Sequence, residues 1–522
     1  MGSIVIGVYA IYLLLKLNKT IQFLQQNRYN RGNKYIKYLN AHIKNTYLTY
    51  ELLFIPLFTL LYFLEINEGY AFAGIFTLFI AIRIYLMRVE QKKLPLKYTY
   101  RVIRLHITTI FLYAVIMYVF NLYPFPFGFV LWGAIYLNHF IVILANYINT
   151  PIEKLIGLYY KRMAMKKLKS LTNLKVIGIT GSYGKTSSKN ILSDVLNVKF
   201  NAMPTPKNFN TPFGLTMTIN NNLDKFNDYF IAEMGACKKG EIKELCDLVH
   251  PTYGILTKVG VAHLETFGSE ENIQKTKFEL IESLPSNGIG ILNKDDPKQV
   301  SYKGNFKCQI LWIGIDNKDV DVYAYNIKLS SAGTTFKVKF KDDKKTYDFS
   351  TKLLGKNNIY NILAALALGN SLGISKDMLV QGVKKVKQIE HRLEIKKYYD
   401  MHLIDDAYNA NPDGCKMALS VLDMMPGKKI VISSGMIELG DLADKYHYEL
   451  GQNMAKTTDE IILIGKEQTK EIYHGLIDSK YDKEKIHVLS NVLDAFDLVH
   501  ELKGKDTYIL LQSDLPDIFN EK

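Results

Sequence analysis

Long apolar runs fill the first third of the chain and set it apart from the rest. Four of them are each about 15–20 residues long with few charges, the length of helix needed to cross roughly 30 Å of hydrocarbon. A fifth run is shorter. The pattern therefore predicts an α-helical membrane domain over residues 1–150, with four or five spans. The runs are Leu52–Ile66, Tyr70–Met87, Leu105–Leu122, Phe129–Ile148 and the shorter Ile4–Leu15.

The charges between these runs indicate on which side of a membrane each connection lies. Segment 16–48 holds seven basic residues and no acid, and segment 88–104 holds six basic residues against one acid. The alternate connections, 65–69 and 121–128, contain no Lys or Arg. Because basic connections stay in the cytoplasm, everything after the last run is predicted to be cytoplasmic. The N-terminus is then outside if Ile4–Leu15 is a span, and four spans suffice if it lies on the surface.

Residues 151–174 follow as a basic helical segment, which we expect to lie beside the membrane over anionic lipid. The chain is thus predicted to be a multi-pass protein of the cell membrane, with lipid and other membrane-bound enzymes as its neighbours. A soluble bundle of buried helices is the alternative explanation for the apolar runs, because a core helix has a similar composition.

After residue 175 the hydrophobic pattern changes to short β-branched runs that alternate with amphipathic stretches. This alternation is typical of α/β sheets with helices on both faces. We expect a central α/β domain over residues 175–388 and a C-terminal doubly wound, Rossmann-like domain over 389–522. Strands near 459–465, 485–490 and 507–512 complete the second sheet.

The run from Lys175 to Leu192 combines a strand, a glycine turn and the start of a helix. Backbone N–H groups of such a turn point at phosphate oxygens, while a lysine charge and a Thr hydroxyl serve the outer phosphates and Mg²⁺. The generic spacing requires Gly where Ile179 stands, so the motif is imperfect. The residues expected to hold a nucleotide are Gly181, Ser182, Gly184, Lys185, Thr186 and Ser187.

Composition narrows the classes of function. With 48% hydrophobic and 22% charged residues, the chain is neither disordered nor collagen-like. The net charge is +14, but residues 1–175 hold 21 Lys and Arg against 5 Asp and Glu, an excess of 16 that leaves about −2 for the rest. Nucleic acid is therefore not an expected partner. Four cysteines without a C-x-x-C pair exclude a disulfide scaffold and a zinc knuckle, and they fit a reducing compartment.

The loop Thr180-Gly-Ser-Tyr-Gly-Lys-Thr resembles the nucleotide loop of the Mur ligases, ATP-dependent amide-forming enzymes of bacterial cell-wall synthesis, which depart from the generic spacing in the same way. Further likenesses follow in the family's order. Lys207-Asn-Phe-Asn-Thr-Pro-Phe-Gly, which contains Asn210, is similar to a turn that approaches the phosphates. Tyr229-Phe-Ile-Ala-Glu is similar to the strand that ends in a magnesium-binding Glu, here Glu233.

Two more stretches resemble the metal-binding part of the family. Val259-Gly-Val-Ala-His-Leu-Glu carries His263 in the place of a magnesium-binding His, and Ile273-Gln-Lys-Thr-Lys-Phe-Glu carries Lys277 in the place of a lysine that is carbamylated in most members. The resemblance implies two Mg²⁺ ions, the first held by Thr186 and Glu233 and the second by His263 with carbamylated Lys277. Lys275 is the alternative to Lys277.

The last third resembles the lid and second-substrate parts of the MurF-type branch, which attaches D-alanyl-D-alanine. In Lys356-Asn-Asn-Ile-Tyr-Asn, Asn358 stands where the family contacts adenine, and Arg392 stands where an arginine reaches the γ-phosphate. Asp-Asp-Ala-Tyr-Asn-Ala-Asn-Pro closely resembles that branch, which implies nucleotide contacts for Asp406 and Tyr408. The catalytic residues that the resemblance implies are Lys185, His263, Lys277 and Arg392.

The resemblance implies that ATP phosphorylates a carboxylate and that an amine then captures the acyl phosphate. Because a membrane domain stands in place of the family's uridine-binding domain, we expect a cell-envelope precursor, lipid-linked or uridine-linked, as acceptor. An amino acid or dipeptide supplies the amine. The run Leu511-Gln-Ser-Asp-Leu departs from the Lys-Gly-Ser-Arg-like run that the MurF-type branch has near the incoming amine. The resemblance therefore defines the amine substrate less closely than it defines the ATP chemistry.

Two other functions remain open from the sequence. A poly-γ-glutamate-type synthase also joins membrane spans to a Mur-like ATPase. A nucleotide-gated transporter is the alternative of another class, although it needs polar residues along the spans, where only Arg83, His106 and His139 are candidates.

Overall fold

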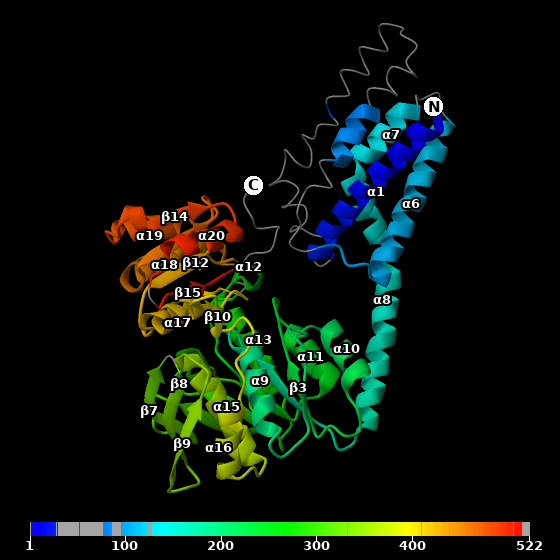
Figure 1. Ribbon diagram of the computed structural model, residues 1–522. Helices are drawn as coiled ribbons and strands as arrows, with labels where there is room; N and C mark the ends of the chain where they lie inside the picture. Colours follow the sequence, from blue (N-terminus) through cyan, green and yellow to red (C-terminus); the bar gives the residue numbers. More distant parts are fainter. Residues whose placement is uncertain are drawn as a thin grey trace. The chain divides into compact units, whose positions relative to one another are not determined.

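The computed structural model divides into two compact units, one that ends at Leu158 and one that begins at Tyr159 (Figure 1). It describes residues 2–27, 29, 52, 77–85, 95–122, 127–262, 264–330, 332–408, 410–437, 439–504 and 506–513. The first unit is helical, and the second contains two α/β sheets.

The first unit contains α1, α6, α7 and the first part of α8, and residues 77–85 are also helical. The predicted run Ile4–Leu15 lies within α1, and Leu105–Leu122 lies almost wholly within α6. Residues 53–66 of the run Leu52–Ile66, and half of Tyr70–Met87 (residues 70–76 and 86–87), lie outside the described residues. The bounds are Gly2–Gln26 for α1, Tyr100–Asn121 for α6, Phe127–Tyr136 for α7 and Asn138–Ser170 for α8.

The run Phe129–Ile148 does not form the single helix that its hydrophobicity predicted. Its first part belongs to α7, which ends at Tyr136, and its second part belongs to α8, which begins at Asn138. Asn138 accepts a hydrogen bond from Tyr113 of α6 at 2.6 Å, so a buried polar contact occupies the break. Within the described part of the chain, one helix, α6 over Tyr100–Phe120, is long and apolar enough to cross a membrane. The membrane domain therefore stays a prediction.

The last part of α8 packs on the second unit, to which it belongs from Tyr159 onward. Ala164 is fully buried there, Lys167 Nζ donates to the carbonyl of Asn220 at 2.9 Å, and Asn220 Nδ2 donates to the carbonyl of Tyr160 at 3.1 Å. Basic side chains of this segment thus bind protein groups, and the expected lipid contact remains a prediction.

The central domain is built on a nine-stranded sheet in the order β2-β3-β1-β4-β5-β6-β7-β8-β9. The strands from β2 to β7 pair in parallel, whereas β7, β8 and β9 form an antiparallel meander. The bounds are β1 Lys175–Thr180, β2 Ala202–Pro204, β3 Tyr229–Glu233, β4 Tyr253–Leu256, β5 Ile289–Asn293, β6 Gln309–Gly314, β7 Val322–Ser330, β8 Gly333–Phe340 and β9 Thr346–Thr351.

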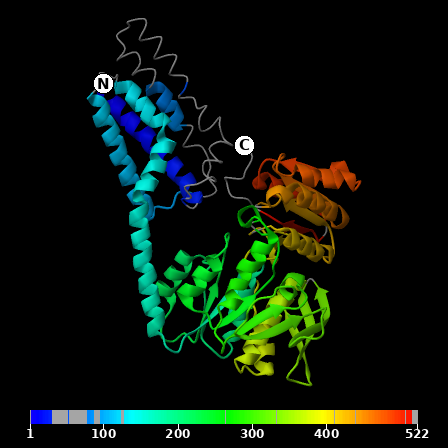
Figure 2. The same cartoon turned by 180° about the vertical axis from the view of Figure 1, so that it is seen from behind.

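Helices cover both faces of this sheet, so its central strands are buried on two sides and read as continuous apolar runs. One core gathers α9, α15 and α16, and the other gathers α10, α11 and α13 with the end of α8. Figure 2 shows the domain from behind, coloured from teal through green to yellow. The bounds are α9 Lys185–Leu196, α10 Pro212–Asn222, α11 Glu241–Val249, α12 Leu264–Phe267, α13 Glu270–Glu282, α14 Pro297–Val300, α15 Lys356–Ser371 and α16 Lys376–Lys385.

The C-terminal domain has a six-stranded sheet in the order β10-β11-β15-β12-β13-β14, parallel except for the edge pair β10–β11. Three of its strands lie where the sequence predicted them, which confirms a doubly wound second sheet. The strands are β10 Glu394–Tyr398, β11 Met401–Asp405, β12 Lys429–Ser433, β13 Glu460–Ile464, β14 Ile486–Leu489 and β15 Tyr508–Leu511. The helices are α17 Pro412–Asp423, α18 Ala443–Thr457, α19 Lys470–Asp478 and α20 Val492–Leu502, with short turns η2 Gly440–Leu442 and η3 Lys483–Lys485.

Candidate active site

The glycine turn between β1 and α9 has the backbone that a phosphate loop requires. Gly181 and Gly184 have positive φ angles of 153° and 79°, and a Cβ on Gly181 would lie 2.0 Å from the Thr257 hydroxyl. Ser182 N donates to the carbonyl of Lys258 at 2.7 Å, which ties the loop to the segment after β4. The loop therefore lies at the carboxyl ends of three adjacent parallel strands, β3, β1 and β4.

Lys185 begins α9 and folds back over this loop. Its Nζ donates to the carbonyls of Gly181 at 2.8 Å and Ser182 at 3.2 Å. Burial lowers the pKa of Lys185, and Arg392 lowers it further, while Glu233 opposes both. The ammonium group thus lies against the loop, as expected of a group that meets phosphate oxygens.

Thr186, Asn210 and Glu233 meet beside the loop, although they come from three separate segments. Thr186 Oγ1 lies 3.2 Å from Glu233 Oε1, and Asn210 Nδ2 donates to the same oxygen at 3.1 Å. Glu233 ends β3, pairs with Ile179 of β1, and is 1% exposed. A hydroxyl and a carboxylate are oxygen ligands of the kind that Mg²⁺ takes alongside substrate phosphates, so these residues fit the predicted first ion.

Lys189 is a member of this cluster that the sequence analysis missed. Its side chain is 1% exposed, its Nζ lies 2.9 Å from Glu233 Oε2, and it also donates to the carbonyl of Lys207. The only signal in the sequence is its position four residues after Lys185, which places both lysines on one face of α9.

Lys277 is buried, whereas Lys275 is not, and this distinguishes the two candidates for the modified lysine. Lys277 is 2% exposed and its Nζ donates to the carbonyl of Ala236 at 3.3 Å, while Lys275 pairs with Glu271 at the surface. Burial lowers the pKa of Lys277 to about 7, and the charge of Lys185 contributes. A substantial fraction of this amine is therefore neutral near pH 7.

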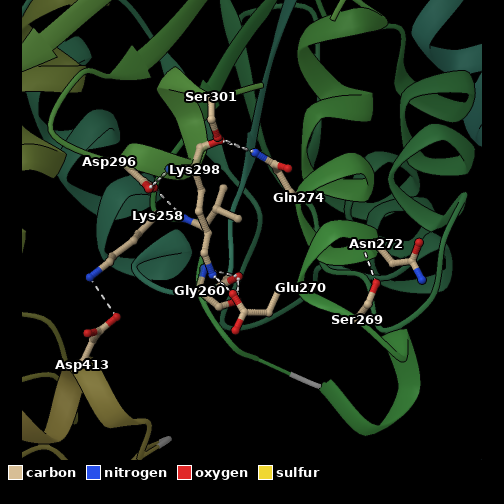
Figure 3. A network of polar contacts seen from close by, with 12 residues as sticks. Lys258, Gly260, Ser269, Glu270, Asn272, Gln274, Asp296, Lys298, Ser301 and Asp413 are labelled. Atoms are coloured by element: carbon tan, nitrogen blue, oxygen red, sulfur yellow. Dashed lines mark hydrogen bonds and ion pairs between the residues drawn. The ribbon is translucent and has the colours of Figure 1, made fainter. Parts of the chain in front are cut away.

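His263 lies outside the described residues, so its predicted role as a ligand stays a prediction. Figure 3 shows the contacts that hold the chain on either side of it. Asp296 accepts from Val259 N at 3.0 Å, and Gly260 N donates to Ser182 Oγ at 3.0 Å. The bond to Ser182 connects the segment before position 263 directly to the nucleotide loop, and the bond to Asp296 connects it to the start of α14. Across the described residues, no group of three or more His, Cys, Asp and Glu side chains forms a metal site.

The start of α15 also approaches the loop. Asn358 is buried, and its Nδ2 donates to the carbonyl of Leu354 at 2.8 Å, so this amide is bound to the segment just before its own helix. Asn361, one turn later, is the side chain that faces the loop, because a Cβ on Gly184 would lie 3.4 Å from Asn361 Oδ1. Nothing in the sequence alone distinguishes Asn361 from the other polar residues at the start of this helix.

The C-terminal domain contributes a compact group of charged and aromatic side chains. The guanidinium of Arg392 lies 4.3 Å from the centre of the Tyr408 ring. Burial raises the pKa of Asp406 to about 7, and the charge of Arg392 opposes this. Arg392 also interacts with Glu233 electrostatically. The structure thus brings three of the predicted nucleotide residues, Arg392, Asp406 and Tyr408, into one group.

An ion pair joins this domain to the segment that holds the loop. Lys258 Nζ lies 2.8 Å from Asp413 Oδ2, and in Figure 3 the two side chains point toward each other. Lys258 is also the residue whose carbonyl receives Ser182 N. Asp413 lies in the first turn of α17, next to the Asn-Pro sequence that the MurF-type resemblance includes.

Two domain families match the part of the chain that carries these contacts. The Mur ligase middle domain matches residues 179–369, and the Mur ligase glutamate ligase domain matches residues 391–514. The UDP-N-acetylmuramoyl-tripeptide--D-alanyl-D-alanine ligase of Bacillus subtilis (strain 168) is 30% identical over 380 residues, which are 72% of this chain and 79% of that enzyme. This chain belongs to the Mur ligase family. It is therefore an ATP-dependent amide ligase, as the sequence predicted.

Other Mur ligases agree with this assignment. The Escherichia coli (strain K12) enzyme with the same name is 33% identical over 296 residues, 56% of this chain and 65% of that enzyme. MurF from Acinetobacter baumannii superposes with a TM-score of 0.61 at 25% identity, covering 69% of this chain and 77% of its own. MurF from Thermotoga maritima, solved in complex with ADP, gives 0.61 at 26% identity, covering 68% and 80%.

The predicted departure from the MurF-type branch lies at the end of β15, and it stays a prediction. Gln512 is fully buried and its Nε2 donates to the carbonyl of Cys415 at 3.1 Å, while Ser513 Oγ accepts from Ser434 N at 2.9 Å. These two side chains connect β15 to α17 and to the end of β12. The side chain of Gln512 thus serves packing within the domain.

Proposed function

We propose that this Mur ligase is a MurF-type enzyme that extends a muramyl peptide during synthesis of peptidoglycan precursors. ATP activates a terminal carboxylate of the peptide, and D-alanyl-D-alanine or a single amino acid supplies the amine. The observation that carries the proposal is the meeting of Lys185, Thr186 and Glu233 at one glycine loop, with the buried Lys277 near enough for the charge of Lys185 to act on it. The substrates named for the Bacillus subtilis and Escherichia coli relatives support the substrate class.

The reaction has two steps. An oxygen of the acceptor carboxylate bonds to the γ-phosphorus as the bond to the β-phosphate oxygen breaks, which yields an acyl phosphate and ADP. The amine nitrogen then bonds to the acyl carbon, phosphate leaves with the C–O electron pair, and the nitrogen loses a proton. Lys185 and Arg392 hold the negative charge that moves during both steps. Mg²⁺, when bound by Thr186 and Glu233, neutralises the phosphate oxygens.

We further propose that Lys277 is carbamylated. The neutral amine forms an N–C bond to CO₂ and releases one proton, which converts a cation into an anion. Its burial and its lowered pKa support this, because CO₂ reacts with the unprotonated amine. With His263, the carbamate is proposed to serve a second Mg²⁺ near the transferring phosphoryl group.

The apolar first unit supports a membrane-anchored enzyme with cytoplasmic catalytic domains and a lipid-linked acceptor. Helix α6 exposes large apolar side chains that a helix in water would bury, among them Ile107, Phe111 and Tyr118, which are 62–69% exposed. A site held against a bilayer suits a substrate that carries a lipid. The uridine-linked muramyl peptide is the competing acceptor.

The decisive experiment is acceptor-dependent phosphate release by the detergent-solubilised full-length protein. Lipid-linked and uridine-linked muramyl peptides are each supplied with ATP, Mg²⁺ and either D-alanyl-D-alanine or single amino acids. We expect phosphate release only when acceptor and amine are both present, with the lipid-linked acceptor preferred. Release with the uridine-linked compound alone would reject the lipid-linked acceptor, and no acceptor-dependent release would reject the proposed function.

The relatives and structures that the chain resembles are amino-acid or peptide ligases, and they favour neither a polyglutamate synthase nor a transporter. His106 is one of the three polar residues that a transport path would need, and its side chain already has a hydrogen-bond partner. His106 Nε2 lies 2.7 Å from Asn18 Oδ1, in a contact between α6 and α1.

A further inference from the structure

Lys189 is a buried lysine whose ammonium group lies beside the carboxylate of Glu233, and its position suggests a function other than packing. Lys189 is 1% exposed and lies one helical turn after Lys185 on α9. Its Nζ lies 2.9 Å from Glu233 Oε2 and donates to the carbonyl of Lys207, at the start of the turn that carries Asn210. The ammonium group therefore touches both segments that flank the loop.

Stability alone is a poor explanation for this pair. Removing two charges from water often costs as much as their attraction returns, and apolar side chains of the same volume are frequently as stabilising. The residues that follow Lys189 on α9, Ile191 and Leu192, belong to a large apolar core, so an apolar side chain at a buried position of this helix is the simpler solution. The charge at Lys189 is better explained by what it does to Glu233.

The two oxygens of Glu233 have different partners. Oε1 faces the loop and accepts hydrogen bonds from Thr186 and Asn210 at 3.2 and 3.1 Å, whereas Oε2 makes an ion pair with Lys189 and no hydrogen bond within the described residues. A carboxylate bound in this way can give a metal ion one oxygen but not both. Mg²⁺ demands nearly octahedral geometry and is well served by a carboxylate that binds through one oxygen.

We propose that Lys189 is a positioning residue that holds Oε2 of Glu233, so that Oε1 alone is presented beside Thr186 to the divalent cation of the nucleotide. The inference rests on the proposed function, in which Glu233 binds Mg²⁺. It assigns Lys189 no contact with ATP or with the acceptor. Lys185, on the same face of α9, remains the lysine that is proposed to contact the phosphates of the nucleotide.

The test measures binding of Mn²⁺ as a probe, by electron paramagnetic resonance of the full-length protein in the presence of ADP. Lys189→Met keeps the length of the side chain and removes its charge. We expect this variant to bind Mn²⁺ at least about tenfold more weakly than the unmodified protein, because the carboxylate is no longer held. Binding of ADP without metal is expected to change little.

Lys275→Met is the matched control, because it removes a Lys–Glu pair from the surface of α13 and leaves the cluster intact. It is expected to bind Mn²⁺ like the unmodified protein. Equal Mn²⁺ affinity in Lys189→Met would overturn the inference, even if that variant melts at a lower temperature. An unmodified protein that binds ADP but no Mn²⁺ would instead reject the proposed function, and the inference with it.

A second measurement avoids the risk that Lys189→Met does not fold. A crystal structure of the unmodified protein with ADP and Mg²⁺ is expected to show one oxygen of Glu233 on the ion and Lys189 within hydrogen-bond distance of the other. A carboxylate bound to the ion through both oxygens, with Lys189 turned away, would overturn the inference.

Discussion

Individual side chains decide the chemistry of this site, and Lys277 is the one whose environment is most unusual. Lys277 is 2% exposed and its Nζ donates to a backbone carbonyl. Charged lysines are rarely buried to this extent. We expect Lys277→Ala to lower acceptor-dependent phosphate release at least about tenfold, the scale on which groups around a metal act. A small carboxylate such as acetate, added at high concentration, is expected to restore part of the rate.

The exposed Lys275 provides the comparison, since Lys275→Ala removes a nearby lysine of the same helix without changing the buried cluster. Its rate is expected to match that of the unmodified protein. Unchanged turnover in Lys277→Ala would show that this lysine takes no part in the reaction.

Gly181 provides a second test at the scale of one residue. Its φ is 153°, and a side chain has no room there, because a Cβ would lie 2.0 Å from the Thr257 hydroxyl. We expect Gly181→Ala to distort the loop and weaken ADP binding at least about tenfold, with a strain cost of about 1–3 kcal/mol. Titration with ADP measures this. Gly157→Ala, at a helical position where nothing lies within 4 Å, should bind ADP normally.

The sequence identified the residues of the loop because their spacing along the chain is local, but it could not identify Lys189 or Asn361. Both face the site only because α9 and α15 pack against the same sheet, and a lysine within a helix reads as a surface charge. Asn358 was predicted from resemblance, yet its amide binds Leu354, which the linear pattern could not show.

Between elements, the pair Lys258–Asp413 connects the end of β4 to the first turn of α17. Both side chains are more than 40% exposed, so solvent screens their attraction. A double-mutant cycle with Lys258→Ala and Asp413→Ala is expected to give a coupling of about 0.2–1 kcal/mol in the free energy of unfolding. A coupling of several kcal/mol would show that the pair is far less screened than its exposure indicates.

Strands were predicted more accurately than the helices of the first unit. Short β-branched runs bounded by turns place β13, β14 and β15 correctly, because such runs pack between the helical layers of the domain. The run Phe129–Ile148 failed as a single helix because hydrophobicity does not register the turn at Leu137 or the buried contacts of Asn138.

At the scale of the whole molecule, the core of the second unit includes residues that precede the segment matched by the Mur ligase family. The Mur ligase middle domain is matched from residue 179, but Ala164, Met165 and Leu168 of α8 already pack in its core. We expect a fragment that begins at Lys175 to melt roughly 5 °C or more below one that begins at Tyr159, because it loses this apolar contact. Thermal unfolding of both fragments decides, and equal melting temperatures would contradict the prediction.

Helix α8 has one further consequence, which concerns the rotation of side chains about its axis. From Tyr159 onward it belongs to the second unit, where Ala164 is fully buried and Lys167 donates to the carbonyl of Asn220 in α10. One residue inserted between Ala164 and Lys167 turns one of them by about 100° relative to the other. We therefore expect such an insertion to cost one of the two contacts, whereas a loop in the same place would absorb it.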